Sequence, residues 1–243
     1  MPPTDASADT ATAPGSDASA GRSPATDGED TLHLRLPEEF LALCAKADAD
    51  ATRDELLGRV GDWGRTRTSV GAFELVRVEI ERDLPLITRW MNDPAVAAFW
   101  ELAGPQTFTE AHLRAQLAGD GRSVPCLGVL EGSPMSYWEI YRADLDPLAR
   151  HYPARPHDTG IHLLIGEAVD RGRGVGGALL RAVADLVLDK RPACARVVAE
   201  PDLRNTPSVA AFLSAGFRFS AEVDLPTKRA ALMIRDRSVR DLL

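Results

Sequence analysis

The sequence predicts an α/β (α+β) fold, in which a mixed sheet of six or seven strands carries helices on both faces. Three consecutive segments lead to this prediction. Residues 160–166 alternate as a strand does, residues 175–190 repeat with the period of a helix, and residues 194–199 form a second apolar strand. Because a helix linking two strands of one sheet brings the chain back in the same direction, these strands are expected to be parallel.

Charge and hydropathy narrow the class of protein. The chain has 243 residues and a formal net charge of −8, most of it in residues 1–30, which hold six acids and one base. The remaining chain is nearly balanced, which argues against nucleic acid and against an anionic membrane as partners. No apolar run reaches membrane-spanning length, and the first residues lack the basic and apolar regions of a signal peptide. We therefore expect a cytoplasmic protein.

The cysteines and histidines predict no metal site. Cys44, Cys126 and Cys194 are odd in number and widely separated, so they are expected to be small buried apolar residues in a reducing compartment. Neither they nor the five histidines have the spacing of metal ligands.

Composition divides the chain into three parts. Residues 1–30 contain no valine, leucine or isoleucine, so they cannot offset the entropy of ordering and are expected to form a disordered tail. Residues 31–70 are predicted to be a strand–helix extension packed on the core, with Pro37 opening its helix and residues 61–70 as a loop. Residues 71–238 are expected to form the main domain.

Ahead of the central unit, the pattern predicts a strand, three helices and a hairpin. Asp83 is the expected cap of the first helix, which has a proline in its first turn. The tetrad Glu131–Pro134 is rich in turn residues and joins the two hairpin strands. The expected ranges are strand 73–80, helices 84–92, 95–100 and 109–118, strands 124–130 and 135–142, and a loop at 151–158.

Two helices and two strands complete the predicted order. The central helix stops before Pro192, and a second helix runs from the cap Asn205 to Gly216. Two last strands are expected at 217–223 and 230–235. The expected inner residues are Val175, Leu179, Ala182 and Leu186 in the central helix, and Val209, Phe212 and Leu213 in the second.

The loop before the central helix, RGRGVGG, is predicted to bind an anion. Its glycines leave the unpaired N–H groups of the helix N-terminus open to a ligand, and the helix dipole adds positive potential. Two arginines add mobile positive charge, which suits a phosphate or pyrophosphate. The residues expected to bind it are Arg171, Gly172, Arg173, Gly174, Val175, Gly176 and Gly177.

Two alternatives stay open for this loop on the residues alone. It is also compatible with a plain glycine-rich turn before a helix. Gly172, Gly174 and Gly177 match the G-x-G-x-x-G pattern of dinucleotide folds, but Glu167–Arg171 intervene after the strand, where such folds have almost no residues.

Beyond single motifs, the chain resembles a known superfamily. It carries R-x-x-G-x-G at Arg171, Gly174 and Gly176, and its order of elements is similar to that of the GNAT superfamily of acyl-coenzyme A dependent N-acyltransferases. Within it, residues 32–237 resemble the siderophore-pathway acyltransferases of the aerobactin, mycobactin and desferrioxamine type, with the desferrioxamine branch most similar. The blocks that carry the resemblance are WMNDPAVAAFWE (90–101), PMSYWEIY (134–141), GIHLLIG (160–166), AEPDLRN (199–205) and LPTKRAALM (225–233).

The resemblance implies the ligands. In this superfamily the central parallel strands splay, the pantetheine arm lies between them and the glycine loop takes the pyrophosphate; Asn205 matches the asparagine that contacts the coenzyme arm. The co-substrate is then acetyl-CoA or succinyl-CoA, without a metal. The acceptor is a small molecule, an N-hydroxylated diamine of the N-hydroxycadaverine type or N6-hydroxylysine, which becomes a hydroxamate. Both a monomer and a homodimer stay open.

His162 and Asp202 match the catalytic histidine and aspartate of this subgroup. Acyl transfer needs a neutral nucleophile, a group that takes its proton, a stabilised oxyanion and a proton for the leaving thiolate. The resemblance assigns proton transfer to His162, and to Asp202 the orientation or deprotonation of the N–OH group or the polarisation of the histidine. On residue type alone, His162 is also compatible with a core histidine and Asp202 with a turn residue or cap.

The acceptor pocket is predicted to involve Trp100, Trp138 and Glu139, with core packing as the alternative for both tryptophans. Two other function classes stay open. One is acyl transfer to a protein or antibiotic amine. The other is a nucleotide-binding oxidoreductase or a coenzyme sensor, in which Glu200 would be the acidic ribose partner.

Overall fold

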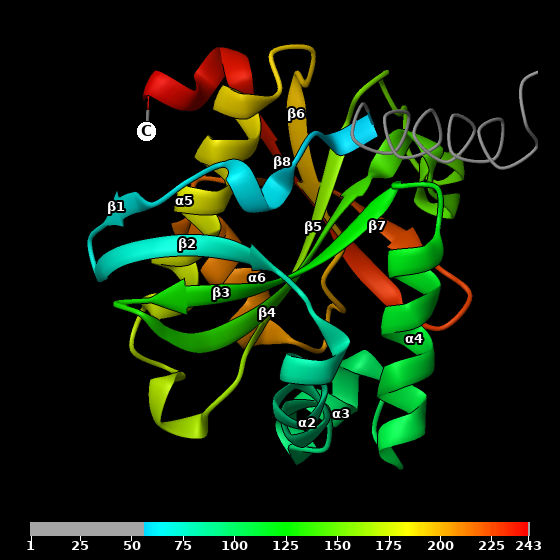
Figure 1. The fold of residues 1–243 in the computed structure, drawn as a ribbon. Coiled ribbons are helices and arrows are strands. Elements are labelled where there is room, and N and C mark those ends of the chain that lie inside the picture. Colours follow the sequence, from blue (N-terminus) through cyan, green and yellow to red (C-terminus); the bar gives the residue numbers. More distant parts are fainter. Residues whose placement is uncertain (1–55, 243) are drawn as a thin grey trace, which may run out of the picture.

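The computed structural model describes residues 56–242, which are organised around one mixed sheet (Figure 1). Its strands are β1 (Thr66–Thr68), β2 (Gly71–Arg77), β3 (Ser123–Leu130), β4 (Ser133–Arg142), β5 (Thr159–Ile165), β6 (Arg196–Ala199), β7 (Arg218–Asp224) and β8 (Arg229–Asp236). Their spatial order is β1-β2-β3-β4-β5-β6-β8-β7. Neighbours are antiparallel except β5 and β6, whose parallel pairing was predicted.

The sheet has eight strands within residues 56–242, against the six or seven predicted. The additional strand is β1, which lies in the stretch 61–70 that was expected to be a loop. Three residues are enough to form this strand because a tight turn brings β1 directly against β2. The turn leads into Gly71, whose φ of 132° is a backbone conformation that glycine adopts readily. So short an edge strand leaves little periodicity to read in the sequence.

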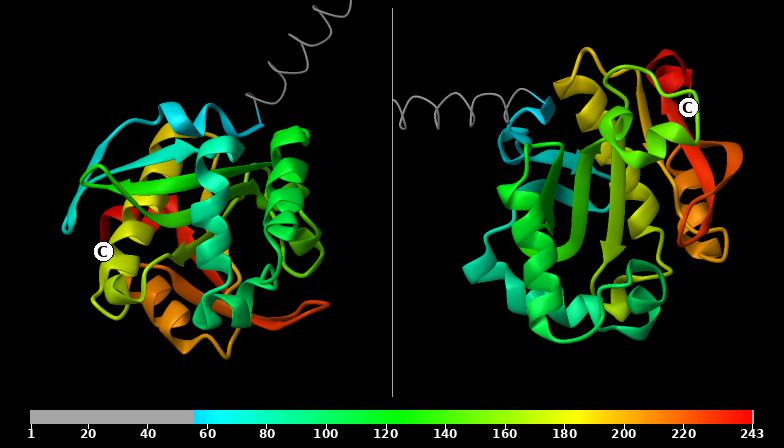
Figure 2. Two further views of the ribbon diagram at one scale, coloured as in Figure 1. Left: turned by 60° about the horizontal axis from the view of Figure 1, so that its bottom comes forward. Right: turned by 90° about the vertical axis from the view of Figure 1, so that its right-hand side faces the viewer.

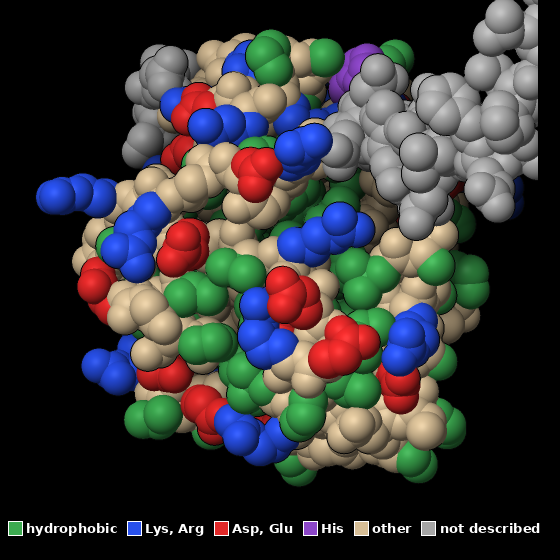
Figure 3. Space-filling model, in the orientation of Figure 1, with side chains coloured by type: hydrophobic (Ala, Val, Ile, Leu, Met, Phe, Trp, Pro, Cys, Tyr) green, Lys and Arg blue, Asp and Glu red, His purple; other side chains and the backbone are tan. Residues whose placement is uncertain are grey.

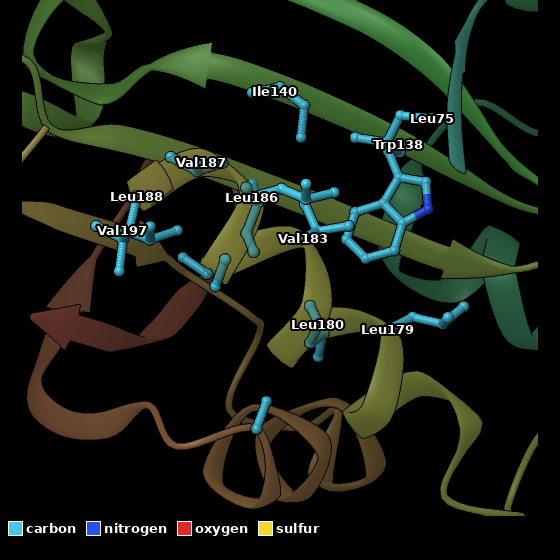
Figure 4. Packing of buried hydrophobic residues seen from close by; sticks show 14 of the residues in the cluster. Leu75, Trp138, Ile140, Leu179, Leu180, Val183, Leu186, Val187, Leu188 and Val197 are labelled. Carbon is cyan, nitrogen blue, oxygen red and sulfur yellow. The ribbon is translucent and has the colours of Figure 1, made fainter. Parts of the chain in front are cut away.

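Five α-helices of the described residues cover the two faces of the sheet (Figure 2). They are α2 (Ile80–Met91), α3 (Pro94–Trp100), α4 (Gln106–Ala118), α5 (Val175–Lys190) and α6 (Thr206–Ser214). Because side chains alternate along β4, this strand contributes to the hydrophobic clusters on both faces of the sheet. Trp138 and Ile140 point into a cluster built on α5, and Tyr137 points into one built on α2 and α4. Figure 4 shows Trp138 and Ile140 against the leucines and valines of α5.

The parallel pair parts early, and this positions the site. Only Thr159 with Val197 and Gly160 with Val198 are paired between β5 and β6. Beyond them β5 continues to Ile165 without a partner on that side among residues 56–242, so the strands splay as the fold prediction requires (Figure 1). The His162 side chain, which is one-third exposed, lies beside this opening.

Two local predictions are wrong. Helix α2 begins at Ile80, four residues before the expected start, because Asp83 acts from inside its first turn. The buried Asp83 carboxylate accepts the Glu79 N–H at 2.9 Å, so it caps the helix without being its N-cap residue. On α6, Leu213 is half exposed instead of inward, and Phe212 is the buried residue.

The predicted tail 1–30 and most of the 31–70 extension lie outside the described residues. The last part of the extension does pack on the core, since Leu57, Val60 and Trp63 are buried in the α5 cluster. On the face shown in Figure 3, acidic and basic side chains are interspersed. Within residues 56–242 no helix is long and apolar enough to cross a membrane, and no cluster of metal-ligating side chains occurs.

Candidate active site

His162 lies between two carboxylates that come from different strands. It faces Glu139 across the β4–β5 ladder, and its Nδ1 is 2.9 Å from Glu139 Oε2. Its Nε2 is 2.5 Å from Oε1 of Glu200, the residue that follows β6. Because β5 and β6 separate beyond Gly160, the ring fits between the strands and both of its nitrogens are engaged.

Glu139 also joins the site to α4. Its Oε1 is 2.7 Å from His112 Nε2 and accepts from Gln116 Nε2 at 2.7 Å and from the Tyr137 hydroxyl at 3.0 Å. The carboxylate is almost fully buried, with 8% of the side chain exposed. Its buried negative charge is thus compensated by donors on three elements.

Glu200 is held in a similar way from the other side. Its Oε2 accepts from the Tyr141 hydroxyl at 2.7 Å, and Lys228 Nζ lies 3.5 Å from its Oε1. The Tyr141 ring also packs against His162, with 4.8 Å between ring centroids. Tyr141 is two residues beyond Glu139 on β4, so the alternation of the strand places both on the same face.

These contacts shift the pKa values of all three central groups. Burial by itself disfavours the imidazolium, but Glu200 and Glu139 outweigh it and raise the pKa of His162 to about 10. Burial alone would raise the pKa of Glu200, yet His162 and Lys228 lower it to about 2. The pKa of Glu139 is likewise lowered, against its burial, by hydrogen bonds from His112 and His162. All three shifts favour the charged form of the group concerned.

A cavity of about 440 Å³ opens at this trio. It is lined by His162, Glu139, Glu200, Asp202 and Trp100, so four of the residues predicted for catalysis or acceptor binding meet there. Trp100 closes one side, edge-on to His162 with 6.0 Å between ring centroids. The His162 side chain is one-third exposed to this cavity.

A second groove, of about 640 Å³, runs from the cavity to the glycine loop. Its walls come from α3, β5, α5 and α6, and it is mostly apolar in character. The residues that line both spaces are Phe99, Trp100, Leu163, Asn205, Ser208 and Phe212. The two spaces therefore adjoin, one at His162 and the other at the glycine loop.

The glycine loop has the geometry of an anion site. Gly172 and Gly174 have φ of 71° and 78°, and a Cβ at either position would meet nothing within 4 Å. The backbone N–H groups of residues 172–177 have no acceptor within residues 56–242. Arg173 is exposed and likewise has no partner in that part of the chain. Unpaired donors at the start of a 16-residue helix favour a phosphate.

Arg171 is not the mobile charge that was predicted. Its guanidinium donates to the carbonyls of Ile165 and Gly166 and to Asp93 Oδ1, at 3.0, 2.5 and 2.9 Å. Asp93 is the N-cap of α3, so Arg171 ties α3 to the end of β5. The spacing of the motif correctly located a glycine loop before α5. It did not reveal that the Arg171 side chain holds α3 and β5 together.

Asp202 and Asn205 both lie at the cavity, each with a local partner. The Asp202 carboxylate pairs with Arg204 at 2.7 Å, and the carboxylates bound to His162 are Glu139 and Glu200. Polarisation of the histidine, one of the roles considered for Asp202, therefore does not match the contacts. Asn205 caps α6 by accepting the Ser208 N–H at 3.2 Å and also lines both spaces.

Trp138, which was predicted for the acceptor pocket, does not line the cavity at His162. It is fully buried on the opposite face of β4 from Glu139, packs on Phe73 and donates to Ser136 Oγ at 2.9 Å. The strand alternation that places Glu139 in the cavity necessarily turns its neighbour into the core. Core packing, the alternative, is the correct reading.

Several residues of the site were not predicted as such, namely Glu200, His112, Gln116, Tyr141 and Lys228. An acid directly after a parallel strand is a recognisable signal for Glu200, since ligands gather at the carboxyl ends of such strands. No sequence signal marks His112, because its partner Glu139 is 27 residues away.

Comparison with known proteins shows similarity to acyltransferases and acetyltransferases. The acetyltransferase (GNAT) domain model matches residues 79–225. The lysine N-acyltransferase MbtK of Mycolicibacterium paratuberculosis is 37% identical over 166 residues, which cover 68% of this chain and 75% of that one. The N(6)-hydroxylysine O-acetyltransferase of Escherichia coli is 38% identical over 64% of this chain and 49% of its own. The N-hydroxyputrescine acetyltransferase of Acinetobacter baumannii is 30% identical over 54% and 62%.

Solved structures share the fold. An uncharacterized protein from Bacillus halodurans has a TM-score of 0.69 at 32% identity, covering 74% of this chain and 92% of that chain. The aminoglycoside acetyltransferase AAC(6')-Ib in complex with coenzyme A has a TM-score of 0.63 at 24% identity, covering 70% and 98%.

Proposed function

Since this chain belongs to the acetyltransferase (GNAT) family and is an acyltransferase, we propose that it acylates an N-hydroxylated diamine or N6-hydroxylysine to a hydroxamate, in the manner of siderophore biosynthesis. The observation that carries the proposal is that the His162 cavity adjoins the groove that ends at the glycine loop, with six lining residues in common. The names of the similar relatives, acting on lysine, N(6)-hydroxylysine and N-hydroxyputrescine, support this class of acceptor.

The glycine loop and groove fit an acyl-coenzyme A. The unpaired N–H groups of residues 172–177 and the exposed Arg173 suit a pyrophosphate, and the apolar groove suits an extended pantetheine arm. Asn205 lies where that arm would enter the cavity. The acyl donor, acetyl-CoA or succinyl-CoA, would bring its thioester to the cavity end of the groove.

Within the cavity, we assign proton transfer to His162 and orientation of the N–OH group to Asp202. Trp100 and Glu139 form the wall against which the acceptor lies. A hydroxylamine nitrogen is far less basic than an alkylamine, whose pKa is about 10.4, so it arrives largely neutral and places a lighter demand on a base. The acceptor we would test first is a diamine of the N-hydroxycadaverine type. We propose that the natural substrate is a small molecule of the cytoplasm.

The test is release of free thiol from acetyl-CoA and succinyl-CoA, with N-hydroxycadaverine, N6-hydroxylysine and cadaverine as acceptors. We expect turnover with a hydroxylated acceptor, little with cadaverine, and loss of turnover in His162→Ala. Equal turnover of cadaverine and its N-hydroxy form would replace the proposal by a general amine acyltransferase. Thiol release with none of these acceptors would remove it.

A further inference from the structure

Both nitrogens of His162 face carboxylate oxygens, and this limits the ionisation of the ring. A neutral imidazole offers one N–H donor and one lone pair, so one of its nitrogens would point a lone pair at a carboxylate. With both carboxylates ionised, the distances of 2.9 Å to Glu139 and 2.5 Å to Glu200 require a donor at each nitrogen. Only the imidazolium supplies two donors, so the geometry itself selects the charged ring.

The surroundings keep both carboxylates ionised and in place. From β4, the Tyr137 and Tyr141 hydroxyls donate to Glu139 and Glu200 respectively. From α4, His112 and Gln116 contact Glu139, and from the turn between β7 and β8, Lys228 faces Glu200. Asp146, at the end of the 3₁₀-helix η2 (Ala143–Leu145), also interacts electrostatically with the trio. Neither carboxylate has to share a proton to be satisfied.

We propose that Glu139 and Glu200 are positioning residues that hold His162 as an imidazolium, so that His162 enters acyl transfer as a proton donor and not as a base. The part of this inference that concerns turnover rests on the proposed function. The ionisation of the ring does not depend on any substrate.

The step then balances within the site. The acceptor nitrogen forms its bond to the thioester carbon, the C–S bond breaks, and its electron pair leaves with the sulfur. One ring N–H of His162 has to leave its carboxylate for this step: its proton passes to the sulfur, and one N–H proton of the acceptor restores the imidazolium. Between two carboxylates a neutral ring is unfavourable, which drives this return of the proton.

Acceptor choice follows from this arrangement. A site whose histidine is already protonated has no imidazole base with which to deprotonate an alkylammonium. At pH 7 an amine of pKa about 10.4 is neutral in only about one molecule in 10³, whereas a hydroxylamine is largely neutral. On the neutral fraction of the acceptor alone, a site without an imidazole base therefore favours N-hydroxylated acceptors by about three orders of magnitude over the parent amines.

The direct test is the ionisation of His162, measured by NMR on protein labelled with ¹⁵N in histidine. His162→Asn identifies the resonances. We expect both ring nitrogens of the wild type to stay protonated at about pH 8, well above the ordinary histidine pKa. Glu200→Gln should lower the titration midpoint by about 1 to 3 pH units, and Glu139→Gln should also lower it. Glu81→Gln, an exposed acid on α2 away from the cavity, is the matched control and should change nothing.

A pH profile of turnover links the ionisation to the reaction. A proton donor loses activity as pH rises through its pKa, whereas a base gains it. In Glu200→Gln we expect the alkaline loss of kcat/KM for N-hydroxycadaverine to move down together with the NMR midpoint, with circular dichroism confirming the fold. A wild-type His162 that titrates near its ordinary pKa overturns the inference. If the ring is clamped as an imidazolium but no hydroxamate forms, the proposed function fails and the clamp stands.

Discussion

Asp202 is a cavity carboxylate whose only side-chain ion pair among the described residues is local. Its partner Arg204 follows two positions later, with 75% of its side chain exposed. The Asp202 side chain itself is only 6% exposed, but because the cation of the pair stays in water the pair contributes on the order of 1 kcal/mol to stability. The carboxylate is therefore available to meet an acceptor at little cost to the fold.

From this we expect Asp202→Asn to impair turnover much more than stability. The amide keeps the shape of the side chain but cannot hold the N–OH group with a charged acceptor, so kcat should fall by about 10² or more. Thermal unfolding should change little. Asp189→Asn, an exposed acid on α5, is the control for loss of one negative charge. A variant with full kcat would remove Asp202 from the reaction.

The ionisation of His162 also predicts how stability depends on pH. Its pKa is raised from 6.5 to about 10, so its stabilising contribution is fully present below pH 6.5 and is lost as pH rises through about 10. The pKa of Glu200 shifts in the opposite direction, from 4.5 to about 2. Its contribution to stability is therefore present above pH 4.5 and is lost as pH falls through about 2.

Urea unfolding of the wild type and of His162→Asn measures the His162 effect. The difference in free energy of unfolding between the two proteins should shrink from about pH 7 to about pH 10. Parallel pH curves for wild type and variant would show that the ring is not held as an imidazolium.

At the scale of elements, the loop before α5 contains two arginines with different duties. Arg173 is exposed beside the unpaired N–H groups, while Arg171 is bound to β5 and to the cap of α3. Arg173→Ala should raise the KM for acyl-CoA about three- to tenfold, equivalent to about 1 kcal/mol, and leave stability unchanged.

Arg171→Ala should behave in the opposite way. It leaves the Ile165 and Gly166 carbonyls and the Asp93 carboxylate without their donor, which should cost about 1–3 kcal/mol of stability. Denaturant midpoints and KM values for both variants distinguish the two roles. Equal effects of both substitutions on KM would mean that Arg171 also meets the coenzyme.

For the whole molecule, the binding groove joins α3, α5 and α6 to the splayed strand β5. A ligand that bridges these elements binds the folded state and not the unfolded chain. Acetyl-CoA at about 100 times its Kd should therefore stabilise the protein by about 2.7 kcal/mol. Thermal unfolding with and without acetyl-CoA checks this, with adenosine as the matched ligand that lacks pyrophosphate and pantetheine. No shift in Tm would argue against a coenzyme site.

Much of the fold could be predicted from local periodicity. The strand–helix–strand unit around α5, the hairpin of β3 and β4, and the cap at Asn205 all have signals within a few residues. The start of α2 and the strand β1 were missed, because Asp83 caps from within the helix and a three-residue strand has no measurable period. Trp138 was misplaced because alternation tells which residues share a face but not which face is the core.

By itself, the sequence determined the kind of fold and the presence of His162, Asp202, Glu139 and Trp100 at one cavity, since each depends on local spacing or on blocks of similar sequence. Anion binding at the glycine loop stays a prediction. Only the tertiary structure decided which carboxylates meet the histidine. Glu139 comes from the neighbouring strand in register, and Glu200 lies 38 residues from His162, where the parallel strands part. The charge of His162 is set by these contacts across strands, and contacts between distant residues cannot be derived from the period of any one segment.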